Sequence, residues 1–407
     1  MAGRPLHALL LPPAAGAGRL LDALAAALDG SGPAILPLDP GLPSARIDDL
    51  LHAFTPATIE TLDAEIRWRP DDSRPAAPGA GADLPDGTAV VIATSGSTGE
   101  PKGVQLGADA LLASARASLD RIGARPGTRW LCPLPTSHIA GLGVLVRSLV
   151  SGTAPVVVDR LDPTQRNLAA FGCEYASLVP AQLRRMLDAG AGLSAFGAIL
   201  LGGAAIPSGV LTGARAAGAR VITTYGMSET CGGCVYNGVP LDDVRVRTDR
   251  AGRIQISGPV LFSGYRNRPD LTEQALGDGW FTTSDLGEVN EAGHLTVQGR
   301  TDEMINTGGH KVAPGEVAAI LETVPSVREA AVFGEPDSHY GERVTAVVVP
   351  ASFSTPPRLE ELRAAVRRQL PAYAAPRALL IVRTMPLLPS GKPDLASLRG
   401  LGRDHAP

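Results

Sequence analysis

Continuous apolar runs alternate with longer amphipathic stretches along the first part of the chain. Leu6–Leu11, Ala34–Leu38 and Ala89–Ala93 are such runs, and their length is typical of strands that are buried on both faces of a sheet. Leu20–Leu28, between the first two runs, has the apolar spacing of a helix. Residues 69–87 are rich in Pro, Gly, Ala and Asp and hold few large apolar side chains, which predicts a loop.

The alternation continues through the middle of the chain. We predict further strands and helices at Trp130–Leu134, Gly141–Val150, Ala154–Val158, Tyr175–Val179, Ala181–Leu187, Ala198–Leu201 and Val221–Thr224. This order favours a layered α/β domain with a largely parallel central sheet. Beyond Val244 the pattern changes, and Arg253–Ser257 and Leu295–Gln298 are typical of hairpin strands in a small β-rich subdomain.

A third pattern begins after Gly299. Helices and strands are predicted at Pro314–Leu321, Glu329–Phe333, Val344–Val349, Arg358–Gln369 and Leu379–Val382. The predicted fold class is therefore α/β, with a large N-terminal domain (residues 1–300) of layered α/β subdomains plus a β-rich subdomain. A small α+β C-terminal domain (residues 301–407) follows, and we place the boundary near Thr301–Asp302.

Composition narrows the class of protein. A chain of 407 residues with 44% hydrophobic positions can build two or three cores and is not wholly disordered. The net charge of −4, with scattered Arg residues, does not favour a nucleic-acid partner. No apolar run approaches a membrane span, no N-terminal signal is visible, and four cysteines do not make a disulfide framework. We expect a cytoplasmic protein without membrane insertion, and the sequence leaves its oligomeric state open.

One polar segment directly follows a predicted buried strand and carries the strongest chemical signal. It reads Thr-Ser-Gly-Ser-Thr-Gly-Glu-Pro-Lys-Gly over Thr94–Gly103. Its glycines permit tight turns, its hydroxyl and N–H groups can surround a phosphate, and Lys102 adds a mobile positive charge. It is not a Walker A loop, because no Gly-Lys-Ser/Thr closes it and Pro101 disfavours an immediate helix. The alternative is a plain Ser/Gly-rich surface loop.

The chain resembles the adenylate-forming superfamily, which comprises acyl- and aryl-CoA ligases, peptide-synthetase adenylation domains and luciferases. The resemblance rests on several motifs in the family's order and spans most of the chain. They are Thr94–Gly103, Tyr225–Thr230, Trp280–Asp285, Gly299–Asp302 and Pro389–Lys392. It implies that ATP, Mg²⁺ and CoA are used to activate a small-molecule carboxylic acid, and that the C-terminal domain is mobile.

The resemblance also implies roles for individual residues. Glu229 would hold Mg²⁺, Tyr225 would stack on adenine, Asp285 would bind the ribose diol and Arg300 would support ribose and phosphate. The remaining nucleotide-binding positions are Thr94, Ser95, Gly96, Ser97, Thr98, Gly99, Lys102, Gly203, Ala204, Gly226, Met227 and Ser228. By residue type alone these positions could equally be a core Tyr, a turn-capping Asp, a surface Arg or Glu, and a tightly packed small-residue segment.

Two further groups are implied for the chemical steps. Lys392 would bridge the acid carboxylate and the α-phosphate, with Glu229, Thr98 and His138 completing the catalytic set. Asp302 would be the hinge, and Gly308 and Gly309 would line the path of the CoA pantetheine. An isolated Lys392 would otherwise be an ordinary exposed lysine.

Three segments bear on the acid. Pro133–Leu142, Ser177–Leu183 and Tyr225–Gly238 resemble the o-succinylbenzoate–CoA ligases of menaquinone synthesis, in their actinobacterial form. The resemblance implies that His138 walls the acid pocket, although a structural histidine is an alternative. Three alternatives to this function remain. They are another acyl- or aryl-CoA ligase, a stand-alone enzyme that loads a carrier protein, and a non-catalytic nucleotide-binding homologue.

Two points about this pocket stay open in the sequence. Cys231 and Cys234 could be half a zinc site, a redox pair or small apolar pocket walls, and we favour the walls. A donor for the acid's second carboxylate is expected, but nothing selects it among the nearby Ser, Thr, Asn and Arg residues.

Overall fold

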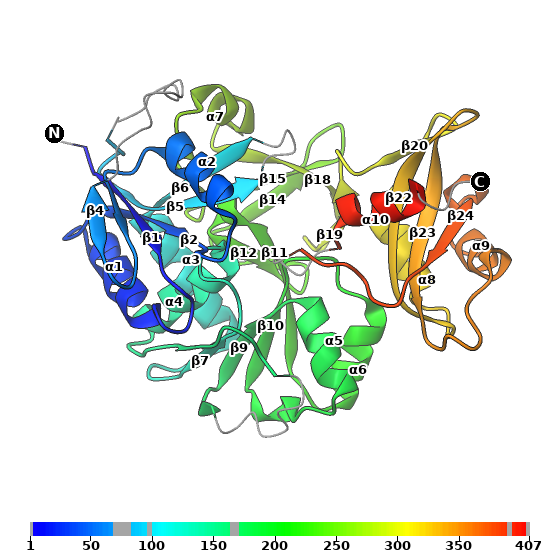
Figure 1. Cartoon of the computed structure of the whole chain (residues 1–407), viewed down its shortest axis with the longest axis horizontal. Coiled ribbons are helices and arrows are strands. Elements are labelled where there is room, and N and C mark those ends of the chain that lie inside the picture. The colour runs from blue at the N-terminus through cyan, green and yellow to red at the C-terminus, as the bar shows by residue number, and fades with distance from the viewer. Residues whose placement is uncertain (1–2, 68–82, 96–99, 163–170, 389–392, 404–407) are drawn as a thin grey trace.

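A computed structural model describes residues 3–67, 83–95, 100–162, 171–388 and 393–403 (Figure 1). Several predicted features lie outside these residues. They are most of the predicted loop at 69–87, the phosphate-loop residues Gly96, Ser97, Thr98 and Gly99, and Lys392.

The first sheet contains seven strands in the order β16-β6-β5-β2-β1-β3-β4. Strands β1, β2, β3 and β5 pair in parallel, whereas β4, β6 and β16 pair antiparallel at its two ends. Its strands are β1 (Leu6–Leu10), β2 (Ala34–Leu38), β3 (Thr58–Glu60), β4 (Glu65–Arg67), β5 (Thr88–Ser95), β6 (Pro101–Gly107) and β16 (Gly264–Tyr265). The accompanying helices are α1 (Ala17–Asp29), α2 (Ser44–Phe54) and α3 (Ala108–Ile122).

The second sheet also contains seven strands, in the order β13-β12-β11-β10-β9-β7-β8, in which β12 pairs antiparallel with both β11 and β13. Its strands are β7 (Trp130–Cys132), β8 (Val156–Val157), β9 (Tyr175–Leu178), β10 (Ala198–Leu201), β11 (Val221–Met227), β12 (Gly232–Tyr236) and β13 (Val239–Pro240). The helices are α4 (Ile139–Val150), α5 (Pro180–Asp188) and α6 (Ser208–Ala216).

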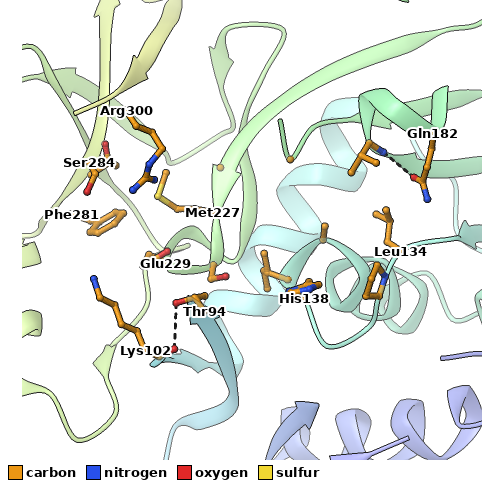
Figure 2. Close-up of a pocket in the computed structure, with 18 of the residues that line it drawn as sticks. Thr94, Lys102, Leu134, His138, Gln182, Met227, Glu229, Phe281, Ser284 and Arg300 are labelled. Carbon is orange, nitrogen blue, oxygen red and sulfur yellow. Dashed lines mark hydrogen bonds between the residues drawn. The ribbon is translucent and has the colours of Figure 1, made fainter. Parts of the chain in front are cut away.

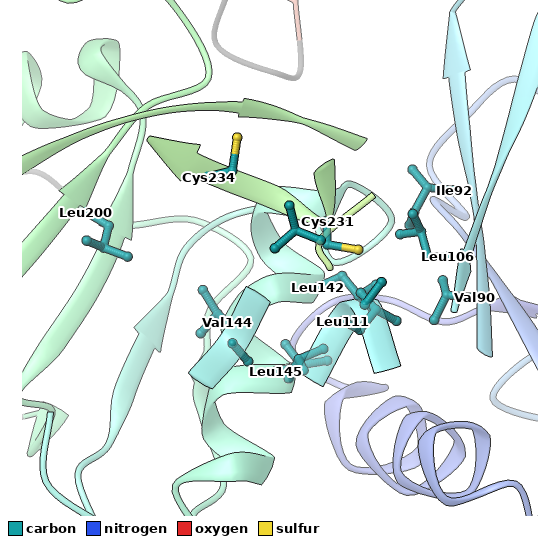
Figure 3. Close-up of a cluster of buried hydrophobic side chains, with 14 of the residues drawn as sticks. Val90, Ile92, Leu106, Leu111, Leu142, Val144, Leu145, Leu200, Cys231 and Cys234 are labelled. Carbon is teal, nitrogen blue, oxygen red and sulfur yellow. The ribbon is translucent and has the colours of Figure 1, made fainter. Parts of the chain in front are cut away.

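Helices α3 and α4 lie between the two sheets and contribute to one continuous core. Figure 3 shows Val90 and Ile92 of β5, Leu111 of α3, Leu142 of α4 and Leu200 of β10 in this core. The strands predicted between Trp130 and Thr224 form one largely parallel sheet, as expected, but the strand–helix rhythm did not show that the earlier strands form a separate sheet. A helix buried on both faces, such as the nearly all-apolar α4, permits a second sheet on its far side.

A third, antiparallel sheet forms the predicted β-rich subdomain, with β18 at its centre. Its strands are β14 (Arg245–Thr248), β15 (Arg253–Ser257), β17 (Leu276–Gly277), β18 (Trp280–Val289) and β19 (Leu295–Arg300). Helix α7 (Pro269–Ala275) precedes β17 and packs beside β16 and β18.

The C-terminal part is a small α+β unit with its own hydrophobic core. Its sheet has the order β21-β20-β23-β22, and β24 joins the edge of β23. The elements are β20 (Ile305–Thr307), β21 (His310–Val312), α8 (Pro314–Leu321), β22 (Val327–Asp337), β23 (Gly341–Pro350), α9 (Leu359–Arg367), β24 (Ala378–Ile381) and α10 (Leu395–Arg403). Val317, Leu362 and Val366 form part of a cluster separate from the main core, and Figure 1 shows this unit beside the larger one. The predicted fold class is thus confirmed.

Within the described residues, no helix has the length and apolar character that a membrane crossing requires.

Candidate active site

A cavity of about 1010 Å³ lies where the two large sheets, the β-rich subdomain and the start of α4 meet (Figure 2). It gathers predicted residues from segments far apart in the sequence. Those that line it are Thr94, Lys102, His138, Gly203, Gly226, Met227, Ser228, Glu229 and Arg300. The convergence of these side chains makes the cavity the candidate active site.

The β5–β6 hairpin supplies one cationic wall of the cavity. Thr94 and Lys102 face each other in the antiparallel register, and Thr94 Oγ1 donates to the carbonyl of Lys102 at 3.3 Å. Lys102 therefore lies on a strand rather than in the loop that was predicted. Its Nζ lies 5.5 Å from the centre of the Tyr265 ring. For Ser95 the structure describes the backbone strand only. A cation fixed on a strand end beside a cavity can attract a phosphate.

Glu229 projects into the cavity from the short 3₁₀ turn that follows β11. The hydroxyl of Tyr265 donates to its Oε1 at 2.9 Å. Burial raises the pKa of Glu229, while the Tyr265 hydrogen bond and the charges of Lys102 and Arg300 act in the opposite direction. A cation that arrives with a ligand would stabilise the ionised form of this desolvated carboxylate.

The donor set of this carboxylate fits magnesium rather than a closed protein metal site. In the described part of the chain, no group of three or more His, Cys, Asp or Glu side chains is placed so that it could hold a metal ion by itself. Magnesium usually binds one or two carboxylates and completes its shell with water and substrate phosphates. Glu229 alone could therefore hold Mg²⁺ together with a bound nucleotide.

A chain of polar contacts connects Tyr225, Asp285, Arg300 and Asp302. The Tyr225 hydroxyl donates to Asp285 Oδ2 at 2.7 Å, and Arg300 Nη1 lies 3.6 Å from Asp285 Oδ1. Arg300 also donates to both carboxylate oxygens of Asp302, at 2.9 and 3.0 Å. The hydrogen bonds that Arg300 donates to Asp302 raise the pKa of Arg300, against the effect of burial. The paired strands β18 and β19 place Asp285 directly opposite Arg300, which no sequence spacing could show.

The far end of the cavity is mostly apolar. Figure 2 shows Gln182 and Leu134 at the end opposite Lys102 and Arg300, with His138 between them. His138 stands at the N-cap position of α4 without a capping hydrogen bond from its side chain, and partial desolvation beside the cavity lowers its pKa, so the ring is neutral at pH 7. Gln182 is held in place, because its Nε2 donates to the Pro133 carbonyl at 2.8 Å. The sequence reasoning missed Gln182 as a wall residue.

Tyr265 is a second residue that the sequence reasoning missed. It lies on β16, and the β16–β6 pairing brings it to Glu229 from 36 residues further along the chain. Its only sequence signal is an aromatic residue within a short polar run, which many surface turns share.

Five predicted site residues do not line the cavity in this structure: Ala204, Tyr225, Asp285, Gly308 and Gly309. Tyr225 belongs to β11 rather than following it, and Asp285 connects it to Arg300, which lines the cavity. Gly308 and Gly309 form the turn between β20 and β21 with φ of 57° and 80°.

The prediction that Cys231 and Cys234 are pocket walls was wrong. Both are buried in the main core, as Figure 3 shows, and neither lines the cavity. Cys231, with a positive φ of 52°, stands between the 3₁₀ turn and β12, and its side chain packs with that of Cys234 in the core cluster.

Comparisons with known proteins agree with this geometry. The AMP-binding enzyme family matches residues 45–257, and its C-terminal domain matches residues 316–392. A probable 2-succinylbenzoate–CoA ligase of Mycobacterium tuberculosis is 43% identical over 405 residues, which cover 97% of each chain.

Solved structures give the same result. The o-succinylbenzoate CoA synthetase of Bacillus subtilis with its acyl-adenylate intermediate superposes with a TM-score of 0.80 at 26% identity, covering 97% of this chain and 88% of that one. The same enzyme with ATP and a magnesium ion gives 0.79 at 25% identity, covering 97% and 89%. The chain therefore belongs to the AMP-binding enzyme family.

Proposed function

We propose that the chain is a 2-succinylbenzoate–CoA ligase of menaquinone synthesis. The acid and ATP would give an acyl-adenylate and pyrophosphate, and the thiol of CoA would then displace AMP to give 2-succinylbenzoyl-CoA. One observation carries the proposal. A cavity with a cationic, carboxylate-bearing end and an apolar end lies in a chain that is 43% identical to a probable ligase of this kind over 97% of its length.

The side chains at the polar end suit the first step. The acid carboxylate must approach the α-phosphate, so two negative groups have to be brought together. Lys102 and Arg300 place positive charge there, and Lys392 would add a third cation between carboxylate and phosphate. Glu229 would hold Mg²⁺, which supplies further charge neutralisation on the phosphates when bound. No protein nucleophile is needed, because positioning and charge neutralisation supply the rate.

The other predicted nucleotide contacts belong to the same proposal. Asp285, positioned by Tyr225 and Arg300, would accept the ribose hydroxyls. Gly203 and Ala204 would leave room beside adenine, and Thr94, Ser95 and the following loop residues would surround the phosphates. His138, neutral at pH 7, would fix the acid at the start of α4.

The second step requires CoA to enter the same cavity. We place the division between a catalytic N-terminal domain and a moving C-terminal domain at residues 300 and 301, beside Asp302. Rotation there would withdraw Lys392 and bring Gly308 and Gly309 toward the pantetheine path. The acid, ATP and CoA are the partners that this cycle needs.

A substrate panel tests the proposal. Purified protein would be incubated with ATP, Mg²⁺ and either 2-succinylbenzoate, benzoate or a long-chain fatty acid, and AMP release and thioester formation would be measured with and without CoA. We expect 2-succinylbenzoate to give a kcat/KM at least about a hundredfold above the other acids. Comparable rates for all three acids would reject the substrate. AMP release that CoA does not accelerate would favour a carrier-loading enzyme instead.

A further inference from the structure

Tyr265 contacts two oppositely charged groups of the candidate active site. Its hydroxyl donates to Glu229 Oε1 at 2.9 Å, and Nζ of Lys102 lies 5.5 Å from the centre of its ring. The first contact is a hydrogen bond to a carboxylate and the second is a cation–π contact. Tyr265 itself lines the cavity. One aromatic side chain therefore connects the carboxylate that would hold magnesium with a cation that would attract phosphate.

Two elements bring Tyr265 to this position. β16 pairs antiparallel with β6, which places Tyr265 opposite Val104, two residues after Lys102. Side chains two residues apart on a strand share a face, so Lys102 is a diagonal neighbour that an aromatic ring can reach across the strands. The amide of Tyr265 donates to Thr272 Oγ1 of α7 at 2.9 Å. The short strand is therefore held on both sides.

The segment that ends at Tyr265 also holds the backbone of Glu229. The amide of Phe262 donates to the main-chain carbonyl of Glu229 at 2.9 Å. The Phe262 ring packs edge-on against Tyr265, with ring centres 4.9 Å apart, and against Phe281 at 5.2 Å. Tyr265 is 7% exposed. Close packing leaves its ring little freedom, so its hydroxyl is directed at the carboxylate.

Packing alone does not account for the hydroxyl of Tyr265. A phenylalanine would fill the same space and contact Phe262 in the same way. A buried hydroxyl destabilises a protein unless it finds a hydrogen-bond partner. Among the described residues the structure shows one such partner, the carboxylate of Glu229. The hydroxyl is thus explained by the site and not by the core.

Lys102 and Glu229 carry opposite charges at the same end of the cavity, as Figure 2 shows. Such charges attract each other more strongly in a partly desolvated cavity than in water. No ion pair joins them in the part of the chain that the structure describes, and each contacts Tyr265 instead. A direct pair would neutralise the two groups that a magnesium–phosphate ligand needs.

We propose that Tyr265 is a positioning residue that keeps Glu229 and Lys102 apart and available for magnesium and phosphate. Its hydroxyl occupies Oε1 of Glu229, and its ring face attracts the ammonium group of Lys102. Oε2 of Glu229 accepts no hydrogen bond from another described residue and remains accessible to a cation. This inference rests on the proposed function, because it takes magnesium to bind at Glu229 and phosphate at Lys102.

The experiment measures ATP binding without any acid, so that no turnover occurs. Isothermal titration calorimetry would compare wild type and Tyr265→Phe with Mg²⁺ and with EDTA. Tyr175→Phe on β9 is the matched control, because Tyr175 is also 7% exposed and does not line the cavity. In Tyr265→Phe we expect the affinity for ATP to fall about tenfold with Mg²⁺ and less than about twofold with EDTA, since the lost hydroxyl acts on the metal ligand.

Steady-state kinetics supply a second measurement on the same variant. In adenylation of 2-succinylbenzoate by Tyr265→Phe, KM for MgATP should rise about tenfold, while KM for the acid should stay within about twofold of the wild-type value.

A double-mutant cycle tests the separation of the two charges. Tyr265→Leu removes the ring as well as the hydroxyl, so that Lys102 and Glu229 can pair with each other. We expect its affinity for ATP in EDTA to fall about fivefold. Adding Glu229→Gln to this variant should release Lys102. The resulting gain in affinity should be at least about fivefold larger than the gain from Glu229→Gln in the wild type.

Three results would overturn the inference. An equal loss with Mg²⁺ and with EDTA in Tyr265→Phe would show a structural role, and no loss in either would show that the hydroxyl does not orient Glu229. Equal gains from Glu229→Gln in both backgrounds would reject the separation of charges. Should Tyr265→Leu not fold, as judged by thermal unfolding, the ratio measured in Tyr265→Phe decides alone.

The proposed function is tested separately from the role of Tyr265. A wild-type protein that binds ATP with Mg²⁺ but does not turn over 2-succinylbenzoate would reject the substrate alone. An active ligase in which Tyr265→Phe binds ATP as the wild type does would reject only the role of Tyr265.

Discussion

At the scale of single residues, Glu229 illustrates a conflict between stability and function. Burial raises its pKa, and a carboxyl with a raised pKa in the folded state destabilises the protein when it is ionised. The penalty is fully present above the folded pKa, shrinks as the pH falls below it, and is gone below the unfolded pKa. A buried carboxyl with a raised pKa that lines a cavity is typical of a functional site.

We therefore expect Glu229→Gln to raise the midpoint of thermal unfolding at pH 8 by about 2–4 °C, equivalent to about 1 kcal/mol. The gain should shrink as the pH is lowered, because the wild-type carboxyl then takes up its proton. Adenylation should fall at least about a hundredfold. Calorimetry across a pH series and pyrophosphate release would measure both, with the exposed Glu291→Gln as control. A variant less stable than wild type at pH 8 would contradict this account.

Lys392 carries a prediction that rests on the motif alone. Lys392→Ala should lower adenylate formation about a hundred- to a thousandfold, because one charge that stabilises the transition state is removed. Thioester formation from a supplied acyl-adenylate should survive. Separate assays of the two half-reactions would measure this, and an equal loss in both would refute the assigned role.

At the scale of elements, the predicted boundaries were best where apolar runs end at turn residues. β2, β10, β15 and α8 have the predicted bounds. Other strands extend beyond the apolar run that predicted them, because hydrogen bonds to a neighbouring strand continue past the end of that run. β11 runs on through Met227, because β12 pairs with its polar end. β6, the strand that follows the phosphate loop, was not predicted. Its antiparallel pairing with β5, and not a run of apolar residues, defines it.

The β11–β12 hairpin also depends on a close backbone approach. A Cβ on Gly226 would lie 2.0 Å from the carbonyl oxygen of Gly232, next to a shift in the strand register. We expect Gly226→Ala to lower the free energy of unfolding by about 1–3 kcal/mol, because backbone must move. Denaturant unfolding would measure this, with Gly209→Ala as control, since nothing lies near a Cβ at that position of α6. Equal effects of the two substitutions would show that the contact does not matter.

At the scale of the whole molecule, a polar contact joins the two parts of the chain. Arg184 of α5 lies 3.3 Å from Glu322, which follows α8, and also donates to the carbonyl of Arg328. Both side chains of the ion pair are largely buried, with 15% and 11% exposure. The contact orients the C-terminal unit in this structure, and it would have to break if that unit rotated.

Rotation about Asp302 gives the prediction at this scale. Asp302→Pro should spare adenylation and block thioester formation, because proline restricts the backbone that has to turn. Asp302→Ala removes the same hydrogen bonds to Arg300 but leaves the backbone free, so it should retain thioester formation. Single-turnover assays of each half-reaction would decide, and unchanged overall turnover in the proline variant would refute the hinge.

The sequence by itself determined the fold class, the order of the motifs and nine of the residues that line the cavity. Those follow from local patterns, namely apolar period, turn residues and short motifs such as Thr94–Gly103. Tertiary structure decided what depends on contacts between distant segments. It added a second sheet, brought Tyr265 to Glu229 and Asp285 to Arg300, and buried Cys231 and Cys234.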